Sequence, residues 1–182
     1  MSGIEESHTD VAGIDATRVS RWLVDNIERL SPPFEFLPIE GGRSNLTYRV
    51  VDNTGITVVL RRPPLGHVLA TAHDMAREYK IISALGQTRV PVPGALGLCV
   101  DATVNGAPFY VMSFVNGTVL DSPESAEQLA FDLRQTVSER LFDVLAELHQ
   151  VDIDAIGLGD LAKRTGYIER QLKRWSTQWS QS

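Results

Sequence analysis

The sequence contains a single cysteine and lacks any long apolar run. With one cysteine in 182 residues, the chain can form neither an internal disulfide nor a metal site built from clustered cysteines. Cys99 lies in the apolar run GALGLCV, so we expect it to be a buried packing residue. No stretch approaches the roughly 18 uncharged apolar residues of a membrane-spanning helix, so the sequence predicts no membrane span.

Positive charge is also scarce, except in one segment. The net charge of −6 at pH 7 argues against general binding of nucleic acid. The first residues, MSGIEESHTDVAGID, have neither the basic nor the apolar region of a signal peptide, so we expect a cytoplasmic protein. Between Gly41 and Lys80, however, six Arg or Lys residues stand against three Asp or Glu residues, and this basic segment begins at a Gly-Gly pair.

Apolar periodicity predicts strands and helices in mixed order over the first two thirds of the chain. With 43% hydrophobic and 22% charged residues, the composition is that of a globular protein. We expect helices over residues 15–30, 73–85 and 167–179, strands over 34–39, 47–51, 56–62 and 108–117, and a further extended section at 90–93.

After residue 117 the pattern becomes helical. Ser122-Pro123-Glu124 is a typical helix start, and Thr136 with Glu139 has the spacing of a capping box, which predicts a second start. The predicted fold class is therefore α+β, a small antiparallel sheet with one inserted helix followed by further helices. We expect a helical extension over residues 1–33, a sheet lobe over 34–117 and the start of a helical lobe over 118–182.

One group of residues in the basic segment predicts a nucleotide site. Strand parity places Arg61 on one face of its strand and Arg62 on the other. Glu78 lies on or beside the apolar stripe of the next helix, where a carboxylate needs a cation, and either arginine is a candidate partner. Glycines that let the backbone approach phosphates, a cation late on the third strand and a helix acid that holds the cation together form a plausible phosphate cradle.

Six segments between Phe34 and Asp152 together resemble one protein family. They are GGRSNLTYRV, VVLRRPPLG, REYKIISAL, VPVPGALGLC, GAPFYVMSFVNG and LAELHQVD. As a set they resemble the aminoglycoside phosphotransferase-like branch of the protein-kinase-like superfamily. The likeness is strongest to the phosphotransferase domains related to those fused to acyl-CoA dehydrogenases.

The resemblance implies a kinase-like N-lobe, then the first helices of a C-lobe, and an ATP-dependent kinase that uses Mg²⁺ and phosphorylates a small hydroxylated substrate. It makes Arg61 the phosphate-binding cation, a role that Arg62 could share, and Glu78 its helix partner. It also assigns a phosphate-covering loop to Gly41, Gly42, Ser44 and Asn45, and a hinge in which Met112 is the gatekeeper and the Ser113 carbonyl and Val115 amide contact adenine.

Kinases of this superfamily also need a catalytic-loop Asp, a following Asn and a metal-binding Asp. HTDVAGID at residues 8–15 lacks the Asn and precedes the glycines, and LHQVDID at 148–154 lacks the spacing. We therefore expect an incomplete helical lobe, no catalytic or metal residue in this chain and no activity of the chain alone. Two alternatives are a non-catalytic lobe that binds nucleotide or protein, and an acyl-CoA dehydrogenase-associated protein. An exposed apolar helix face that includes Trp175 and Trp179 predicts self-association.

Overall fold

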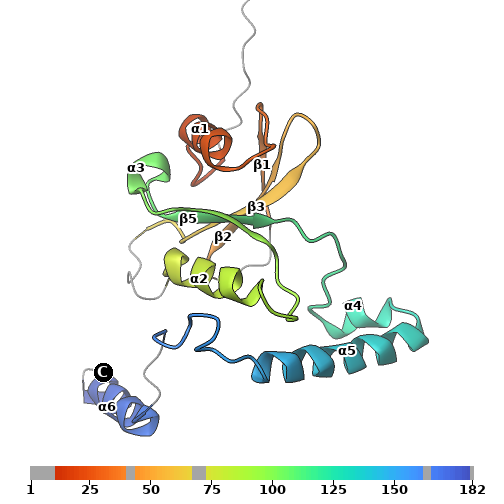
Figure 1. Ribbon diagram of the computed structural model, residues 1–182, viewed down its shortest axis with the longest axis vertical. Helices are drawn as coiled ribbons and strands as arrows, with labels where there is room; N and C mark the ends of the chain where they lie inside the picture. The colour runs from red at the N-terminus through yellow and green to blue at the C-terminus, as the bar shows by residue number, and fades with distance from the viewer. Residues whose placement is uncertain (1–10, 40–43, 67–72, 162–164, 181–182) are drawn as a thin grey trace, which may run out of the picture.

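The computed structural model describes residues 11–39, 44–66, 73–161 and 165–180. Its centre is a five-stranded sheet in the order β1-β2-β3-β5-β4, in which each neighbouring pair is antiparallel (Figure 1). The strands are β1 (Glu35–Pro38), β2 (Leu46–Val51), β3 (Thr57–Arg62), β4 (Ala95–Cys99) and β5 (Phe109–Ser113). The predicted α+β class is thus confirmed, although the extended section expected at 90–93 precedes a strand instead of forming one.

Six helices are present in the described residues. They are α1 (Ala16–Asn26), α2 (Met75–Leu85), α3 (Ala102–Asn105), α4 (Pro123–Glu127), α5 (Phe131–His149) and α6 (Tyr167–Ser180). Figure 1 shows α1 and α2 on opposite sides of the sheet, α4 and α5 at the lower right past the end of β5, and α6 at the lower left, below α2. The helix inserted between β3 and β4 is α2, as the sequence predicted.

The main core lies between α1 and one face of the sheet. The Asp15 side chain accepts a hydrogen bond from the amide of Arg18 and caps the helix, as is typical of Asp at this position. Val19 and Leu23 are fully buried against that face. The sheet side chains of this core that are less than 2% exposed are Phe109, Leu60, Val50 and Val111. Cys99 belongs to the same core and is 3% exposed, which confirms the expected packing role.

Two predicted helix boundaries were misplaced. Helix α1 ends at Asn26, short of residue 30, because Ile27 is extended and Arg29 has a φ of 72°. Helix α5 begins at Phe131, and Thr136 lies inside it, where its hydroxyl donates to the Asp132 carbonyl. The expected helix start at Thr136 was therefore wrong. The residue that does precede α5, Ala130, makes no side-chain cap, so the sequence held no signal at the true start.

A short hairpin turn joins β2 and β3. The buried Asp52 carboxylate accepts hydrogen bonds from the Thr54 amide, the Thr54 hydroxyl and the Ile56 amide, each at 2.8 Å, and from the Ser31 amide at 3.1 Å. The DNTG segment at 52–55, between the strands expected over 47–51 and 56–62, therefore forms a turn. Because one carboxylate organises the turn and also binds Ser31, it fixes the β2–β3 register and the entry into β1 together.

The helices after β5 present apolar side chains to solvent. In α5 Phe131 is 78% exposed and Phe142 69%, and in α6 Trp175 is 61% and Trp179 86% exposed. The end of α5 lies near the sheet lobe. Arg89 and its neighbours, together with Gln150 and its neighbours, line a shared hollow of about 250 Å³. None of the helices in the described residues has the length and hydropathy needed to cross a bilayer.

Candidate functional site

The face of the sheet opposite α1 carries the residues that the sequence singled out. On β3 Val59 and Arg61 point to this face, and on β5 they are paired with Met112 and Tyr110, respectively. Helix α2 covers the face and supplies Glu78. Its first turn is fixed by Asp74, whose side chain accepts from the Arg77 amide, so the helix starts at Met75, two residues later than predicted.

Arg61 and Glu78 form an ion pair across this face. Arg61 Nε donates to Glu78 Oε2 at 3.0 Å, and each side chain is 32% exposed. Arg61 Nη1 also lies 3.5 Å from the Thr47 hydroxyl on β2, which is a weak contact. The hydrogen bond to Glu78 is made by Nε, which leaves N–H groups of the two terminal nitrogens for other partners. A pair with this exposure adds little to stability, since solvent screens it.

The Glu78 carboxylate accepts two further hydrogen bonds. Asn45 Nδ2 donates to Oε1 at 2.8 Å, and the Tyr110 hydroxyl donates to Oε2 at 3.1 Å. Burial and then the Glu78 charge raise the pKa of Tyr110 above its ordinary value, while Arg61 opposes this shift. The hydroxyl therefore stays protonated and remains a donor at neutral pH. Three donors from three separate segments hold one carboxylate.

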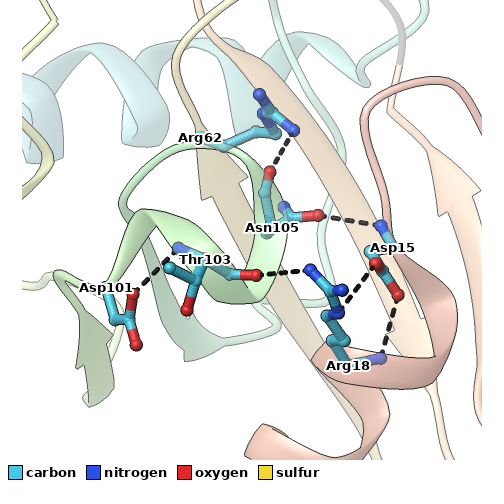
Figure 2. Close-up of polar contacts among 6 residues, drawn as sticks. All are labelled: Asp15, Arg18, Arg62, Asp101, Thr103 and Asn105. Carbon is cyan, nitrogen blue, oxygen red and sulfur yellow. Dashed lines mark hydrogen bonds and ion pairs between the residues drawn. The ribbon is translucent and has the colours of Figure 1, made fainter.

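Arg62 lies on the other face of β3 and has other partners. It is 6% exposed. Its Nη1 donates to the carbonyl of Gly13 and, at 3.0 Å, to that of Asn105, and its Nε donates to Pro63 at 3.2 Å. Figure 2 shows this guanidinium at the junction of β3, α1 and α3. The two arginines thus lie on opposite faces, as strand parity predicted, and the structure places Arg61 beside Glu78, a choice that the sequence left open.

The remaining predicted site residues fall into two groups. Asn45 is 7% exposed at the start of β2 and Ser44 is exposed beside it. Gly41 and Gly42 lie outside the described residues. At the other end of the face, β5 ends at Ser113, whose Oγ accepts from the Gly94 amide at 2.8 Å.

Met112 is half-buried and points to the same face as Arg61, and Val115 is 65% exposed beyond β5. The structure thus brings together Asn45, Arg61, Glu78 and Met112 on one face. Ser113 and Val115 lie at its edge.

Two residues of this site were missed by sequence analysis. Tyr110 is a polar residue in an apolar strand, at the parity that faces α2, and this pattern could have identified it. His73 Nδ1 lies 2.6 Å from Asn45 Oδ1, and no local pattern predicts this contact, because the two residues are 28 positions apart in the chain.

The pair lies on an open surface of the described residues. Two larger hollows lie elsewhere, one of about 610 Å³ between α1 and α3 beside Arg18 and Arg21, and one of about 380 Å³ beside His73 and the turn at residues 63–66. Neither is lined by Arg61 or Glu78. Among the described residues no group of three or more His, Cys, Asp or Glu side chains is placed to hold a metal ion.

Comparison with known proteins places this arrangement in a family. Acyl-CoA dehydrogenase family member 10 of Mus musculus is 37% identical over 149 residues, which cover 81% of this chain and 14% of that protein. Probable acyl-CoA dehydrogenase IBR3 of Arabidopsis thaliana is 34% identical, over 91% of this chain and 21% of that protein. The chain therefore spans about a fifth or less of the length of these curated relatives.

A solved structure supports the fold. A crystal structure of a candidate aminoglycoside phosphotransferase from Ralstonia eutropha matches with a TM-score of 0.71 and 33% identity, over 91% of this chain and 47% of that one. The sheet, the inserted helix and the helices that follow thus match the kinase-like fold of that protein. The pattern of the phosphotransferase enzyme family matches residues 35–182, and the chain belongs to this family.

Proposed function

We propose that these 182 residues supply the nucleotide-binding lobe of an ATP-dependent phosphotransferase that acts on a small hydroxylated molecule. The observation that carries the proposal is the Arg61–Glu78 ion pair, with a distance of 3.0 Å between Nε and Oε2. It lies on the face shared by the end of β3, β5 and α2, beside the segment that leaves the Gly-Gly turn. A cation at this place, held by a helix acid, suits the phosphates of a nucleotide.

Arg61 would bind the phosphate oxygens. Its Nε is committed to Glu78, so the terminal nitrogens are the donors left for a ligand. A guanidinium presents these donors as a planar fork, which matches two oxygens of one phosphate. Backbone amides of Gly41, Gly42 and Ser44 would cover the phosphates, since glycines allow close approach of the main chain.

The adenine would lie at the end of β5. We propose that the Ser113 carbonyl and the Val115 amide contact the base and that Met112 limits the depth of the pocket. The exposed position of Val115 beyond the strand end and the direction of Met112 toward the Arg61 face are consistent with this assignment. The side chain of Ser113 is bound to Gly94, which leaves backbone groups for recognition.

The nucleotide fits the described residues better than the Mg²⁺ that accompanies ATP. The described residues supply no set of metal ligands, so we propose that the metal-binding acid lies outside these 182 residues. Bound Mg²⁺ would neutralise charge on the transferred phosphate. Asp152 acts as a turn residue, because its Oδ1 accepts from the amides of Asp154 and Ala155.

Phosphate transfer also needs a base near the acceptor hydroxyl. No histidine of this sequence is followed by the Asp and Asn spacing of a kinase catalytic loop. We therefore propose that the chain alone binds nucleotide without transferring phosphate. Measurable ATP-dependent phosphorylation of any small alcohol by the purified 182-residue chain would contradict this part of the proposal.

The nucleotide site is tested by the affinity for Mg·ATP, measured by isothermal titration calorimetry. Arg61→Ala removes a charge-assisted contact worth about 1.5–3 kcal/mol, so affinity should fall roughly tenfold to a hundredfold. The control is Arg140→Ala, which removes an exposed arginine of α5 that is 3.4 Å from Asp143. Equal affinity of wild type and Arg61→Ala would contradict the assignment of Arg61.

Two other functions remain as proposals. A non-catalytic lobe would bind Mg·ATP, or a protein, without any acceptor becoming phosphorylated even when a complete helical lobe is present. An acyl-CoA dehydrogenase-associated role is suggested by the names of the relatives. The part of these relatives that matches this chain overlaps the phosphotransferase region at 35–182. Dehydrogenase activity would need a bound flavin, and an absorbance spectrum without flavin bands would count against that activity in this chain.

A further inference from the structure

The Asn45 side chain, just before β2, contacts both Glu78 of α2 and His73, which precedes the first residue of that helix. Its Nδ2 donates to Glu78 Oε1 at 2.8 Å, and its Oδ1 lies 2.6 Å from His73 Nδ1. Asn45 is only 7% exposed. A buried amide with both ends engaged is held in one orientation, because turning it over would lose two hydrogen bonds.

The chemistry of the partners fixes that orientation. An amide oxygen 2.8 Å from a carboxylate oxygen would be repelled, so the nitrogen faces Glu78. The amide oxygen then faces His73 and can only accept, so His73 Nδ1 carries the hydrogen. We assign this tautomer from the contacts, in the order His73 to Asn45 to Glu78.

The same chain of contacts reaches Arg61. Glu78 receives Asn45 on Oε1, and Arg61 and Tyr110 on Oε2. A carboxylate held from three sides has little freedom to turn, so the guanidinium that it binds is held as well. Hydrogen-bond networks of this kind are sensitive to the loss of any one member.

The geometry points to Asn45 as a positioning residue that holds the Glu78 carboxylate, and through it sets Arg61 for phosphate. His73 completes the arrangement by orienting the amide. This inference rests on the proposed nucleotide site. Asn45 itself need not touch the ligand, because its two polar atoms are already bound to Glu78 and His73.

Asn45→Asp is the sharpest single change. It places an oxygen of the introduced carboxylate near Glu78 Oε1, so that two negative charges repel each other. We expect the affinity for Mg·ATP to fall at least tenfold, measured well below the melting temperature of the variant. The matched control is Asn53→Asp, the same change at an exposed turn residue, which should bind like wild type.

Exchanging the amide and the carboxylate between positions 45 and 78 tests whether the effect of Asn45→Asp comes from the lost hydrogen bond or from a general loss of stability. In the double variant Asn45→Asp with Glu78→Gln, the amide and the carboxylate exchange places, and the hydrogen bond between the two positions can re-form. We expect the melting temperature to recover most of what Asn45→Asp loses. Nucleotide affinity should remain low, because Arg61 no longer has a carboxylate at position 78. A swap no more stable than Asn45→Asp would overturn the inference.

The tautomer supplies a readout that needs no ligand. Two-bond nitrogen–proton correlation spectra at alkaline pH, where histidine rings are neutral, should show His73 protonated at Nδ1 in the wild type. In Asn45→Ala this preference should be lost. A His73 ring protonated at Nε2 in the wild type would overturn the network.

The two proposals fail in different ways. Wild-type protein that does not bind Mg·ATP would overturn the proposed function. Wild-type and Asn45→Asp proteins that bind Mg·ATP equally would leave the function standing and overturn the role of Asn45.

Discussion

Arg61 and Arg62 are consecutive in β3, yet their side chains lie on opposite faces of the sheet and have different kinds of partner. Arg61 binds the Glu78 carboxylate at 3.0 Å and is 32% exposed, whereas Arg62 is 6% exposed and binds main-chain carbonyls. Strand alternation alone causes this separation. Arg61 therefore remains accessible to a ligand, whereas Arg62 links β3 to the segment before α1 and to the end of α3.

Arg62→Ala should therefore destabilise the protein. The change leaves the buried carbonyls of Gly13 and Asn105 without their donor, and each unsatisfied group costs about 1–3 kcal/mol. At roughly 2–4 °C per kcal/mol for a chain of this size, we expect a drop in melting temperature of about 4–24 °C. Arg61→Ala is the control, and a larger drop in that variant would contradict the assignment.

Helix α1 should behave as part of the sheet lobe's core. Leu23 is fully buried against the sheet, while its neighbour Val24 is 46% exposed. Leu23→Ala should lower the free energy of unfolding by about 2–5 kcal/mol, and Val24→Ala by less than about 0.5 kcal/mol. Urea denaturation would measure both. Equal effects would mean that α1 is not anchored as described.

The β2–β3 turn should be sensitive to acid. Burial of Asp52 would raise its pKa, but hydrogen bonds from the Thr54 hydroxyl and from the Ser31, Thr54 and Ile56 amides outweigh this and hold the pKa below its ordinary value. Because the folded-state pKa is depressed, the carboxylate stabilises the fold above the unfolded pKa of about 3.9. This contribution is lost as the pH falls through the folded-state value.

Asp52→Asn tests this by removing the charge and keeping the shape. Its melting temperature should be below that of wild type at neutral pH, and the gap should narrow as the pH falls through the folded-state pKa of Asp52, because wild-type Asp52 then also loses its charge. Asp121→Asn, at an exposed position, is the control. A gap that is independent of pH would show that the charge is not what matters.

The apolar face of α6 should promote self-association. Trp175 and Trp179 are 61% and 86% exposed, and large exposed apolar patches drive contacts between molecules. Replacing both with Ser should weaken any concentration-dependent increase in mass seen by sedimentation velocity. Arg174→Ser is the control on the same helix. A chain that remains monomeric at every concentration tested would contradict the prediction.

The sequence by itself determined the local features of this protein. Asp15 marked the start of the helix expected over residues 15–30, because a carboxylate can cap the nearby free amides. The DNTG turn was readable because Asp52 binds residues within four positions of itself. Alternation along β3 separated Arg61 from Arg62, and the apolar stripe of α2 placed Glu78 toward the sheet. Each of these depends on neighbours in the chain.

Only the tertiary structure decided which distant groups meet. Glu78 binds Asn45, 33 positions away, and Tyr110, 32 positions away, while Arg62 binds carbonyls 43 and 49 positions away. Such pairings follow from strand order and from which helix covers which face, and a local pattern contains neither. Sequence thus identified the acid and two candidate cations, whereas the packing of β2, β3, β5 and α2 decided which arginine meets the acid and what else holds it in place.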